Sequence, residues 1–257
     1  MPYIFSIFLL CIVFFLLWLW CRSQKNYSYV DAAWALGLTI PLIVTLFLSE
    51  GNLWRKLILF SMACTWSLRL GLHLLARIRK QHPVEDARYA NLRKLWGTKA
   101  NRNFFFVFLA NSLLIFILSL PYTLPMHYEA KIQFMEYLGI TVFTLGVLGE
   151  TLADYQLKKF KQSSQSGVCA TGLWYYSRHP NYFFEFVLWL GVWLFSCAHV
   201  HPLATLHAPL IMLFLLLRVT GIPPAEKALL ISKGNAYSHY QKATSSFIPW
   251  FPKSTAS

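Results

Sequence analysis

The chain has 257 residues, of which 56% are hydrophobic and 13% are charged, and its net charge is +13. A soluble domain carries nearer a quarter of charged residues, and apolar runs close to the length that crosses a bilayer recur along this chain. The composition excludes a soluble globular domain and predicts an all-α, polytopic integral membrane bundle. Because membrane proteins concentrate Lys and Arg in cytoplasmic loops, we interpret the positive charge as a topology signal and predict no nucleic-acid partner.

The apolar runs predict about seven transmembrane helices, at 2–20, 30–48, 53–76, 104–125, 133–153, 182–199 and 203–222. The first run lacks a preceding basic residue and a following cleavage site, which indicates a span rather than a signal peptide. Loops on one side hold 18 of the 23 Lys and Arg, and the opposite loops hold three. The N-terminus is therefore expected outside and the C-terminus in the cytoplasm. We expect one transmembrane domain over 1–257, and its short loops favour a bacterial inner membrane.

Two cytoplasmic segments look helical without spanning. The first, "EDARYANLRKLWG" (85–97), begins with acids that suit a helix N-terminus and ends in Gly97, which suits a C-cap. Its Tyr89, Leu92 and Trp96 share one helical face, which predicts a short amphipathic helix on the membrane surface. The second segment, 225–242, is a weaker amphipathic pattern broken at Gly234. For both segments, a solvated basic face that only anchors the protein is the alternative interpretation.

Ionisable residues gather in the cytoplasmic half of the predicted spans. Each such residue needs a partner or water, so their shared depth predicts one cytoplasm-facing pocket. Its expected members are Arg69, Glu150, Asp154, Asn181, Glu185, Arg218 and Glu226. The alternative is a structural network that fixes helix packing. The His and Cys residues share no ligand spacing, so no metal site is predicted.

The start of the sixth predicted span concentrates this chemistry. Pro180 fits a first helical turn, where its missing N–H costs nothing. Asn181 and Glu185 are then four residues apart on one face, about 6 Å apart along the axis. Arg178 and His179 stand just before the helix, where free N–H groups favour an anion. The position suits a phosphate or carboxylate bound beside a membrane-embedded pocket, although Arg178 alone is also a plausible interfacial anchor.

Three blocks carry a family resemblance: "GLWYYSRHPNYFFE" (172–185), "GIPPAEK" (221–227) and "YSHYQKATSSFIPWFPK" (237–253). With "YVDAAWALGL", "WSLRLGLHLLAR" and "ADYQLKKF", they resemble the DUF1295 membrane family over about 26–253. Members of that family resemble the C-terminal domain of steroid 5α-reductases. The Arg-His-Pro-x-Tyr pattern is also similar to that of isoprenylcysteine carboxyl methyltransferases and phospholipid methyltransferases.

The reductase resemblance implies an oxidoreductase acting on CH–CH groups with NADPH. Its substrate would be a lipophilic enone of steroid or isoprenoid type, reached from the bilayer. Asn181 and Glu185 match a pair in the reductases' NADPH site, so Glu185 is expected to polarise the substrate carbonyl or orient the nicotinamide. We expect Glu185 and Tyr182 to be catalytic. The residues expected to bind the cofactor are Arg178, His179, Asn181, Asp154, Arg218 and Glu226.

Two other functions stay open. In the methyltransferases, a pattern matched here by Arg178, His179, Tyr182 and Glu226 helps to hold S-adenosylmethionine, which implies methyl transfer to a lipid-borne group. A lipid-binding or assembly factor without catalysis is the third reading. The chain departs from the family at Phe184, where Gly is usual, and this ring is expected to narrow the site. The substrate-activating acid and Tyr of the reductases are not located in the N-terminal half.

Overall fold

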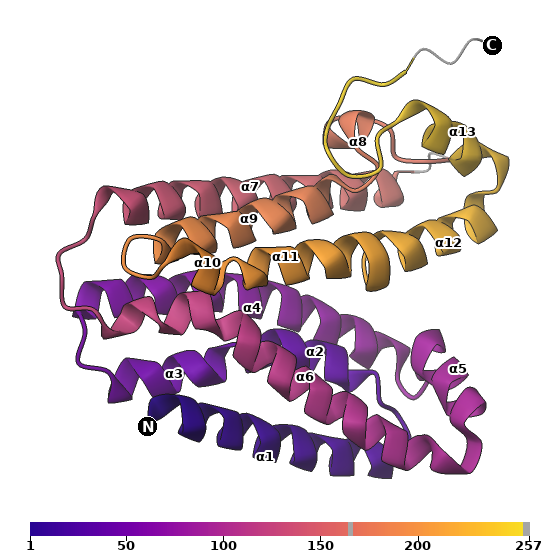
Figure 1. Cartoon of the computed structure of the whole chain (residues 1–257). Helices are drawn as coiled ribbons and strands as arrows, with labels where there is room; N and C mark the ends of the chain where they lie inside the picture. The colour runs from indigo at the N-terminus through magenta and orange to yellow at the C-terminus, as the bar shows by residue number, and fades with distance from the viewer. Residues whose placement is uncertain (164–166, 254–257) are drawn as a thin grey trace. The chain divides into compact units, whose positions relative to one another are not determined.

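The computed structural model describes residues 1–163 and 167–253, and all regular structure within these ranges is helical (Figure 1). This confirms the predicted all-α class. The chain divides into two compact units, Met1–Ile132 and Gln133–Ser257. Each unit is held together by apolar faces of long helices, as expected for a helical membrane protein.

The first unit contains six α-helices, and two of them together occupy one predicted span. Leu38 separates α2 from α3, so the predicted span 30–48 is two helices in series. The elements are α1 (Pro2–Ser23), α2 (Tyr29–Gly37), α3 (Thr39–Leu48), α4 (Leu53–Gln81), α5 (Ala87–Trp96), the 3-10 turn η1 (Gly97–Lys99), α6 (Ala100–Thr123) and the 3-10 turn η2 (Pro125–His127).

Aromatic rings form the core of the first unit where α1 meets α6. Tyr27 stacks on Phe104 with ring centroids 3.9 Å apart, and both side chains are fully buried. Phe14 and Phe108 pack edge to face at 6.4 Å. Such contacts add specific geometry to the burial of apolar area. The Phe14–Phe108 contact therefore helps to fix how α1 and α6 cross, and Tyr27 holds the loop between α1 and α2 against α6.

The start of α4 buries two cations that the loop-charge count placed outside the membrane. The Arg55 side chain is fully buried and donates to the Tyr128 and Ala130 carbonyls, the latter at 2.8 Å. Lys56 Nζ donates to the Ser49 carbonyl at 2.8 Å. These cations satisfy carbonyls of the neighbouring loops, as buried charges require.

Helix α5 confirms the end signals of the first surface segment. Asp86 accepts the Arg88 backbone N–H as an N-cap, and Gly97 closes the helix with φ of 52°. The shared face of Tyr89, Leu92 and Trp96 also exists, but it packs on the aromatic core of the unit. Tyr89 and Trp96 contact Phe104 there, with ring centroids 6.2 and 5.0 Å apart. The placement of α5 on the membrane surface stays a prediction.

The second unit is built around one long helix pair. Its elements are α7 (Phe134–Gln162), α8 (Leu173–Tyr176), α9 (Pro180–Ser196), α10 (Pro202–Thr205), α11 (His207–Phe214), the π-helical turn η3 (Leu215–Val219), α12 (Ile222–Lys233) and α13 (Asn235–Ala243). Pro180 is the first residue of α9, as predicted. Gly234, with φ of 53°, separates α12 from α13 at the predicted break.

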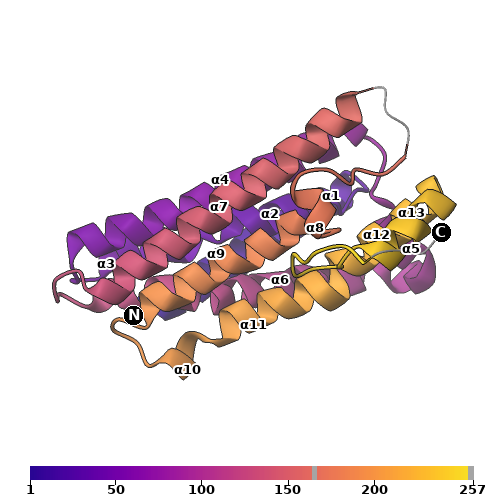
Figure 2. The same ribbon diagram turned by 90° about the horizontal axis from the view of Figure 1, so that it is seen from above.

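Helices α7 and α9 lie side by side along much of their length (Figures 1 and 2). Glycines make this approach possible: a Cβ at Gly191 would lie 2.3 Å from the Phe143 nitrogen, and one at Gly146 would lie 2.6 Å from the Leu188 nitrogen. Small residues drive close helix packing in membranes, where apolar burial between helices gains little. The pair positions the start of α9 beside the end of α7.

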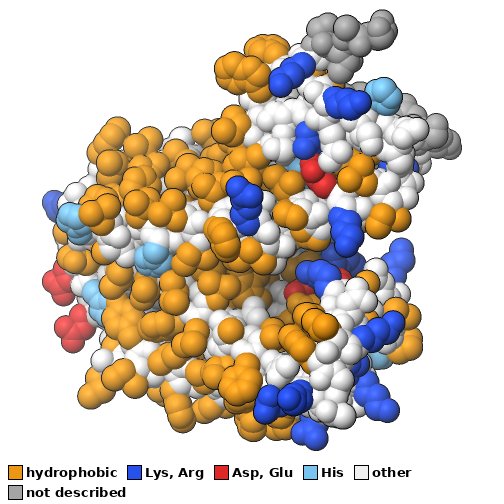
Figure 3. All heavy atoms as spheres, turned by 45° about the vertical axis from the view of Figure 1, so that its right-hand side comes forward, with side chains coloured by type: hydrophobic (Ala, Val, Ile, Leu, Met, Phe, Trp, Pro, Cys, Tyr) orange, Lys and Arg blue, Asp and Glu red, His pale blue; other side chains and the backbone are white. Residues whose placement is uncertain are grey.

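Five helical stretches are long and apolar enough to cross a membrane, within the described ranges: Pro2–Ser23, Tyr29–Leu48, Leu53–Gln81, Ala87–Thr123 and Pro202–Lys233. The protein is therefore an integral membrane protein. Figure 3 shows many hydrophobic side chains on the surface in view, with the visible Lys and Arg mostly toward its right-hand side. The other two predicted spans form helices α7 and α9, but α9 has only 17 residues and α7 carries Glu136 and Glu150. The count of seven and the orientation of the termini stay predictions.

Candidate functional site

The turn that joins α8 to α9 contains three consecutive buried polar residues, Ser177, Arg178 and His179. Arg178 and His179 are 9% and 3% exposed, although both precede an apolar helix. His179 is the N-cap of α9, and its backbone N–H donates to Ser177 Oγ at 3.1 Å. The sequence bends here because Pro180 forces the chain to start a new helix. The turn holds two ionisable side chains inside the protein.

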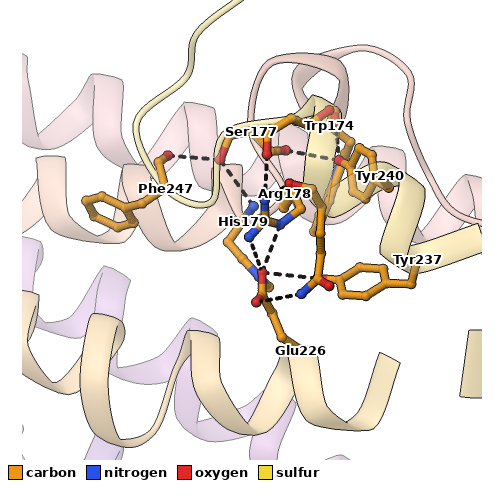
Figure 4. Close-up of polar contacts among 10 residues, drawn as sticks. Trp174, Ser177, Arg178, His179, Glu226, Tyr237, Tyr240 and Phe247 are labelled. Carbon is orange, nitrogen blue, oxygen red and sulfur yellow. Dashed lines mark hydrogen bonds and ion pairs between the residues drawn. The ribbon is translucent and has the colours of Figure 1, made fainter. Parts of the chain in front are cut away.

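Arg178 and Glu226 form the centre of this site (Figure 4). Arg178 Nε and Nη2 both reach Glu226 Oε1, at 2.8 and 2.7 Å. Arg178 Nη1 donates to the Gln241 carbonyl at 2.9 Å and to the Thr244 carbonyl. The guanidinium therefore spends four of its five N–H groups on partners within the protein. An ion pair with such partners is stable although it is largely buried.

Glu226 collects further donors from α13. Tyr237 OH donates to Oε1 at 3.3 Å and Gln241 Nε2 donates to Oε2 at 2.9 Å. Burial raises the pKa of Tyr237, and the nearby Glu226 charge adds to that rise. The carboxylate is therefore surrounded by donors and held as an anion. It links α12 and α13 to the turn before α9.

His179 is the neutral member of the group. Burial lowers the pKa of His179 to about 4, because an imidazolium would lose its hydration, and the Glu226 carboxylate only partly opposes this. With the proton on Nε2, the neutral ring donates to Glu226 Oε1 at 3.3 Å. The Tyr182 ring stacks on the imidazole, with ring centroids 5.3 Å apart and an angle of 8° between the ring planes. At neutral pH this contact is a hydrogen bond rather than an ion pair.

The chain beyond α13 closes over the same turn. The Arg178 backbone N–H donates to the Ser245 carbonyl at 2.8 Å, and Ser177 Oγ donates to the Phe247 carbonyl at 2.8 Å. Tyr240 OH donates to the Trp174 carbonyl (Figure 4). Backbone groups in a turn that would otherwise lack partners are thus satisfied by the C-terminal segment.

Asn181 and Asp154 form a second polar contact, at the first turn of α9 and near the end of α7. Asn181 Nδ2 donates to Asp154 Oδ1 at 3.3 Å. Asn181 Oδ1 is buried, and no protein donor reaches it among the described residues. A buried amide oxygen without a donor is costly. This oxygen is therefore suited to accept a hydrogen bond from a ligand N–H or O–H.

Glu185 lies one turn deeper on α9 and is 5% exposed. Trp189 Nε1 donates to Glu185 Oε1 at 3.1 Å from the next turn of the same helix. The indole fixes the carboxyl orientation within an otherwise apolar helix. The Glu185 carboxyl group in this apolar helix thus receives a hydrogen bond from a residue four positions later.

The predicted pocket residues fall into separate groups in the structure. Arg178, His179 and Glu226 meet at one point, and Asn181 meets Asp154 at another. Glu150 is buried on α7, whereas Arg218 is exposed on the π-helical turn η3. Arg69 belongs to the first unit, on α4. A single pocket containing all seven predicted residues therefore stays a prediction.

A second polar cluster, in the first unit, did not appear among the predicted site residues. Asp31 accepts from Tyr89 OH and from Arg88 Nη2, both at 2.6 Å. Arg88 also bonds Asp86 at 2.9 Å, and Arg77 lies 3.6 Å from the same carboxylate. The sequence signal was an acid that opens a span, Asp31, together with acids and Arg in the α5 segment. Their pairing across more than 50 residues was not visible in the sequence.

Comparison with known proteins supports the family resemblance. The model of the family described as "Protein of unknown function (DUF1295)" matches residues 17–244. An uncharacterized protein of Schizosaccharomyces pombe is 25% identical over 222 residues, which cover 76% of this chain and 64% of the relative. The chain thus matches less than two thirds of that protein's length. No solved structure matches the chain.

Proposed function

The chain belongs to the DUF1295 family, and we propose that it is a membrane-embedded, NADPH-dependent reductase of a lipid-like enone. The observation that carries this proposal is a contrast within the second unit. The Arg178, His179 and Glu226 side chains bond one another, whereas Asn181 Oδ1 is buried and receives no hydrogen bond from residues 1–163 and 167–253. The residues implied by the reductase resemblance include Asn181, whose amide oxygen can accept a hydrogen bond from a ligand. The residues implied by the methyltransferase resemblance include Arg178, His179 and Glu226, which already bond one another.

The residues at the first turn of α9 fit the polar edge of a nicotinamide nucleotide. Asn181 Oδ1 can accept from a carboxamide N–H or a ribose hydroxyl, and the Asp154 carboxylate can accept from ribose hydroxyls. Exposed Lys158, Lys159 and Lys161 at the end of α7 can attract phosphates. Arg178 has one N–H group left for a phosphate, because its other four bond Glu226 and two carbonyls within the protein.

NADPH would supply a hydride to the β-carbon of the enone. The chain's part is to orient the substrate and polarise its carbonyl. Glu185 is placed for this role because it lies deeper than Asn181 on α9 and Trp189 fixes its orientation. Glu185 would polarise the substrate carbonyl or orient the nicotinamide, and Tyr182 is one turn away on the same helix. Helix α9 would thus carry both cofactor-binding and substrate-orienting groups.

Methyl transfer from S-adenosylmethionine is the second candidate, and one observation favours it. Residues 48 positions apart in sequence, Arg178 and Glu226, converge with His179 and Tyr182 into one group. This is the set that the methyltransferase resemblance implies. In this structure, however, the set is already hydrogen-bonded internally, so it offers few free donors to a cofactor.

Two substitutions test the reductase proposal. Asn181→Leu keeps the size of the side chain and removes its amide, so it should abolish stabilisation of the purified protein by NADPH. Glu185→Gln keeps the shape and should spare NADPH binding while reducing NADPH oxidation with a steroid enone or an isoprenoid enone. Asn235→Leu, at an exposed position on α13, is the matched control. Unchanged NADPH binding in Asn181→Leu would refute the assignment of the open amide oxygen.

A further inference from the structure

The last described segment, Phe247–Lys253, presents large hydrophobic side chains on the surface of the second unit. Ile248, Trp250 and Phe251 are 61%, 69% and 74% exposed. Phe247 points the other way and packs against Phe183 on α9, with ring centroids 5.8 Å apart. We call this segment the C-terminal strap.

The strap is held in place by its backbone. The Trp250 N–H donates to the Tyr176 carbonyl at 2.9 Å, and the Lys253 N–H donates to the Ala243 carbonyl at 2.8 Å. The Phe247 carbonyl accepts from Ser177 Oγ. Two prolines in the strap further restrict its backbone. The exposed side chains are therefore displayed by a fixed segment and belong to its folded shape.

Neighbouring rings extend the hydrophobic surface. Phe251 contacts Tyr176 edge to face at 5.8 Å, and Tyr175 and Tyr176 are 48% and 39% exposed. Trp and Tyr favour the zone between hydrocarbon and water, where a ring is buried and its polar atom is wet. The composition of this surface is therefore that of a bilayer interface.

The position of the strap in the unit indicates the same zone. It is bonded to the α8 segment, which precedes α9 and is tied to α7 by the Trp174 Nε1 bond to the Ala153 carbonyl, at 2.9 Å. The strap thus lies at the level where α9 begins. In a membrane bundle, such helix ends lie at the depth of the lipid headgroups.

The chain around the strap is positively charged, as a site that binds anionic headgroups would be. The sequence after Glu226 contains no Asp or Glu, and it contains Lys227, Lys233, Lys242 and Lys253. Lys242 and Lys253 are both exposed. The backbone hydrogen bond from Lys253 to Ala243 brings the end of the strap next to the end of α13, which carries Lys242. A basic segment next to exposed rings attracts anionic headgroups.

We propose that the C-terminal strap is a membrane-interface anchor, with Ile248, Trp250 and Phe251 inserted among the headgroups of an anionic bilayer. Because the strap also bonds Tyr176 and Ser177, its insertion steadies the turn from which α9 starts. The proposal does not depend on which reaction the protein catalyses.

Tryptophan quenching tests the depth of the strap in the whole protein. Wild-type protein and Trp250→Phe are reconstituted in nanodiscs that contain phosphatidylglycerol, and the difference between their emission isolates Trp250. Lipids brominated near the headgroup end of the acyl chain should quench this difference more strongly than lipids brominated near the chain end. Trp250 should also be shielded from iodide in nanodiscs. Trp189→Phe is the control, because Trp189 is fully buried and its signal should resist both quenchers.

Three results would overturn the anchor. Quenching of Trp250 by iodide as complete as that of a free tryptophan amide, without quenching by brominated lipid, would place the strap in water. Shielding from both quenchers in particles that contain two copies would assign the surface to self-association. Stronger quenching by lipid brominated near the chain end would place Trp250 deeper than the headgroups. Because Trp250→Phe changes an exposed ring to another ring, the variant is expected to fold.

Discussion

Replacement of Glu226 by Gln should destabilise the second unit, because Glu226 on α12 binds the Arg178 side chain of the α8–α9 turn. The carboxylate accepts from Arg178, His179, Tyr237 and Gln241. A Gln keeps one acceptor oxygen, but it removes the charge opposite a guanidinium that is 9% exposed. Its new amide N–H₂ group would also face the donors that the carboxylate now accepts from.

The size of the effect follows from the burial of the pair. Loss of one partner of a buried ion pair costs about 3–5 kcal/mol. The side chains of Arg178 and Glu226 are 10% and 18% exposed, so water screens the pair in part and the lower value applies. A loss of about 3 kcal/mol corresponds to a fall of roughly 6–12 °C in the melting temperature of a chain of this size.

Thermal unfolding in detergent measures this effect. Lys227→Gln, at the next and exposed position of α12, is the matched control and should melt like the wild type. Gln241→Ala should cost less, about 1 kcal/mol, because it removes one hydrogen bond and keeps the ion pair. A melting temperature of Glu226→Gln equal to that of the control would refute the view that Glu226 holds α12 and α13 to the turn.

Acid should weaken the fold through His179, whose pKa is lowered from 6.5 to about 4. The unfolded chain takes up this proton at a higher pH than the folded chain does, so stability should be complete above about pH 6.5 and fall by about 3 kcal/mol as the pH drops to 4. In His179→Gln, the melting temperature should depend less on pH in this window, whereas His239→Gln, at an exposed position, should behave like the wild type. An unchanged pH dependence in His179→Gln would contradict the assignment of this effect to His179. Gly191→Ala should destabilise the protein by about 2–3 kcal/mol, because its Cβ would lie 2.3 Å from the Phe143 nitrogen and force α7 and α9 apart. Thr144→Ala, on an exposed face of α7, is the control in thermal unfolding, and equal stability of the two variants would show that the helices are not in close contact at Gly191.

Local signals in the sequence located the helix ends well. Pro180 begins α9, Asp86 and Gly97 bound α5, and Gly234 separates α12 from α13, each as predicted. These features depend on residues within one or two turns of each other. The fixed φ of a proline, the side-chain acceptor of an N-cap residue and the positive φ of a glycine each act on the adjacent turn. The local sequence is therefore enough to predict where these helices begin and end.

The partners of the polar residues were much harder to predict. Shared depth grouped Arg218 with Glu226, but Arg218 is exposed and Glu226 pairs with Arg178 instead. Hydrophobic periodicity gives the depth of a residue and the face it occupies. It does not say which other helix covers that face, and for this reason the contact of Tyr89 with Phe104 was missed.

The C-terminal segment illustrates the same limit. The sequence predicted the weak helix that ends near Lys242, but gave no sign that the Gln241 and Thr244 carbonyls would hold the Arg178 guanidinium. Main-chain acceptors have no sequence signature, because every residue carries one. Their contribution to a site appears only when the fold is known.

The proposed function is tested most directly by the stability of the purified wild-type protein with NADPH, NADH and S-adenosylmethionine side by side. Binding to the folded state raises the melting temperature, and the stabilisation grows with the logarithm of the ligand concentration above its Kd. The account predicts a rise with NADPH that grows with concentration, and no rise with S-adenosylmethionine. A rise with S-adenosylmethionine and none with NADPH would contradict the reductase and favour methyl transfer. No rise with any of the three, in protein shown to be folded, would contradict both and favour the non-enzymatic role.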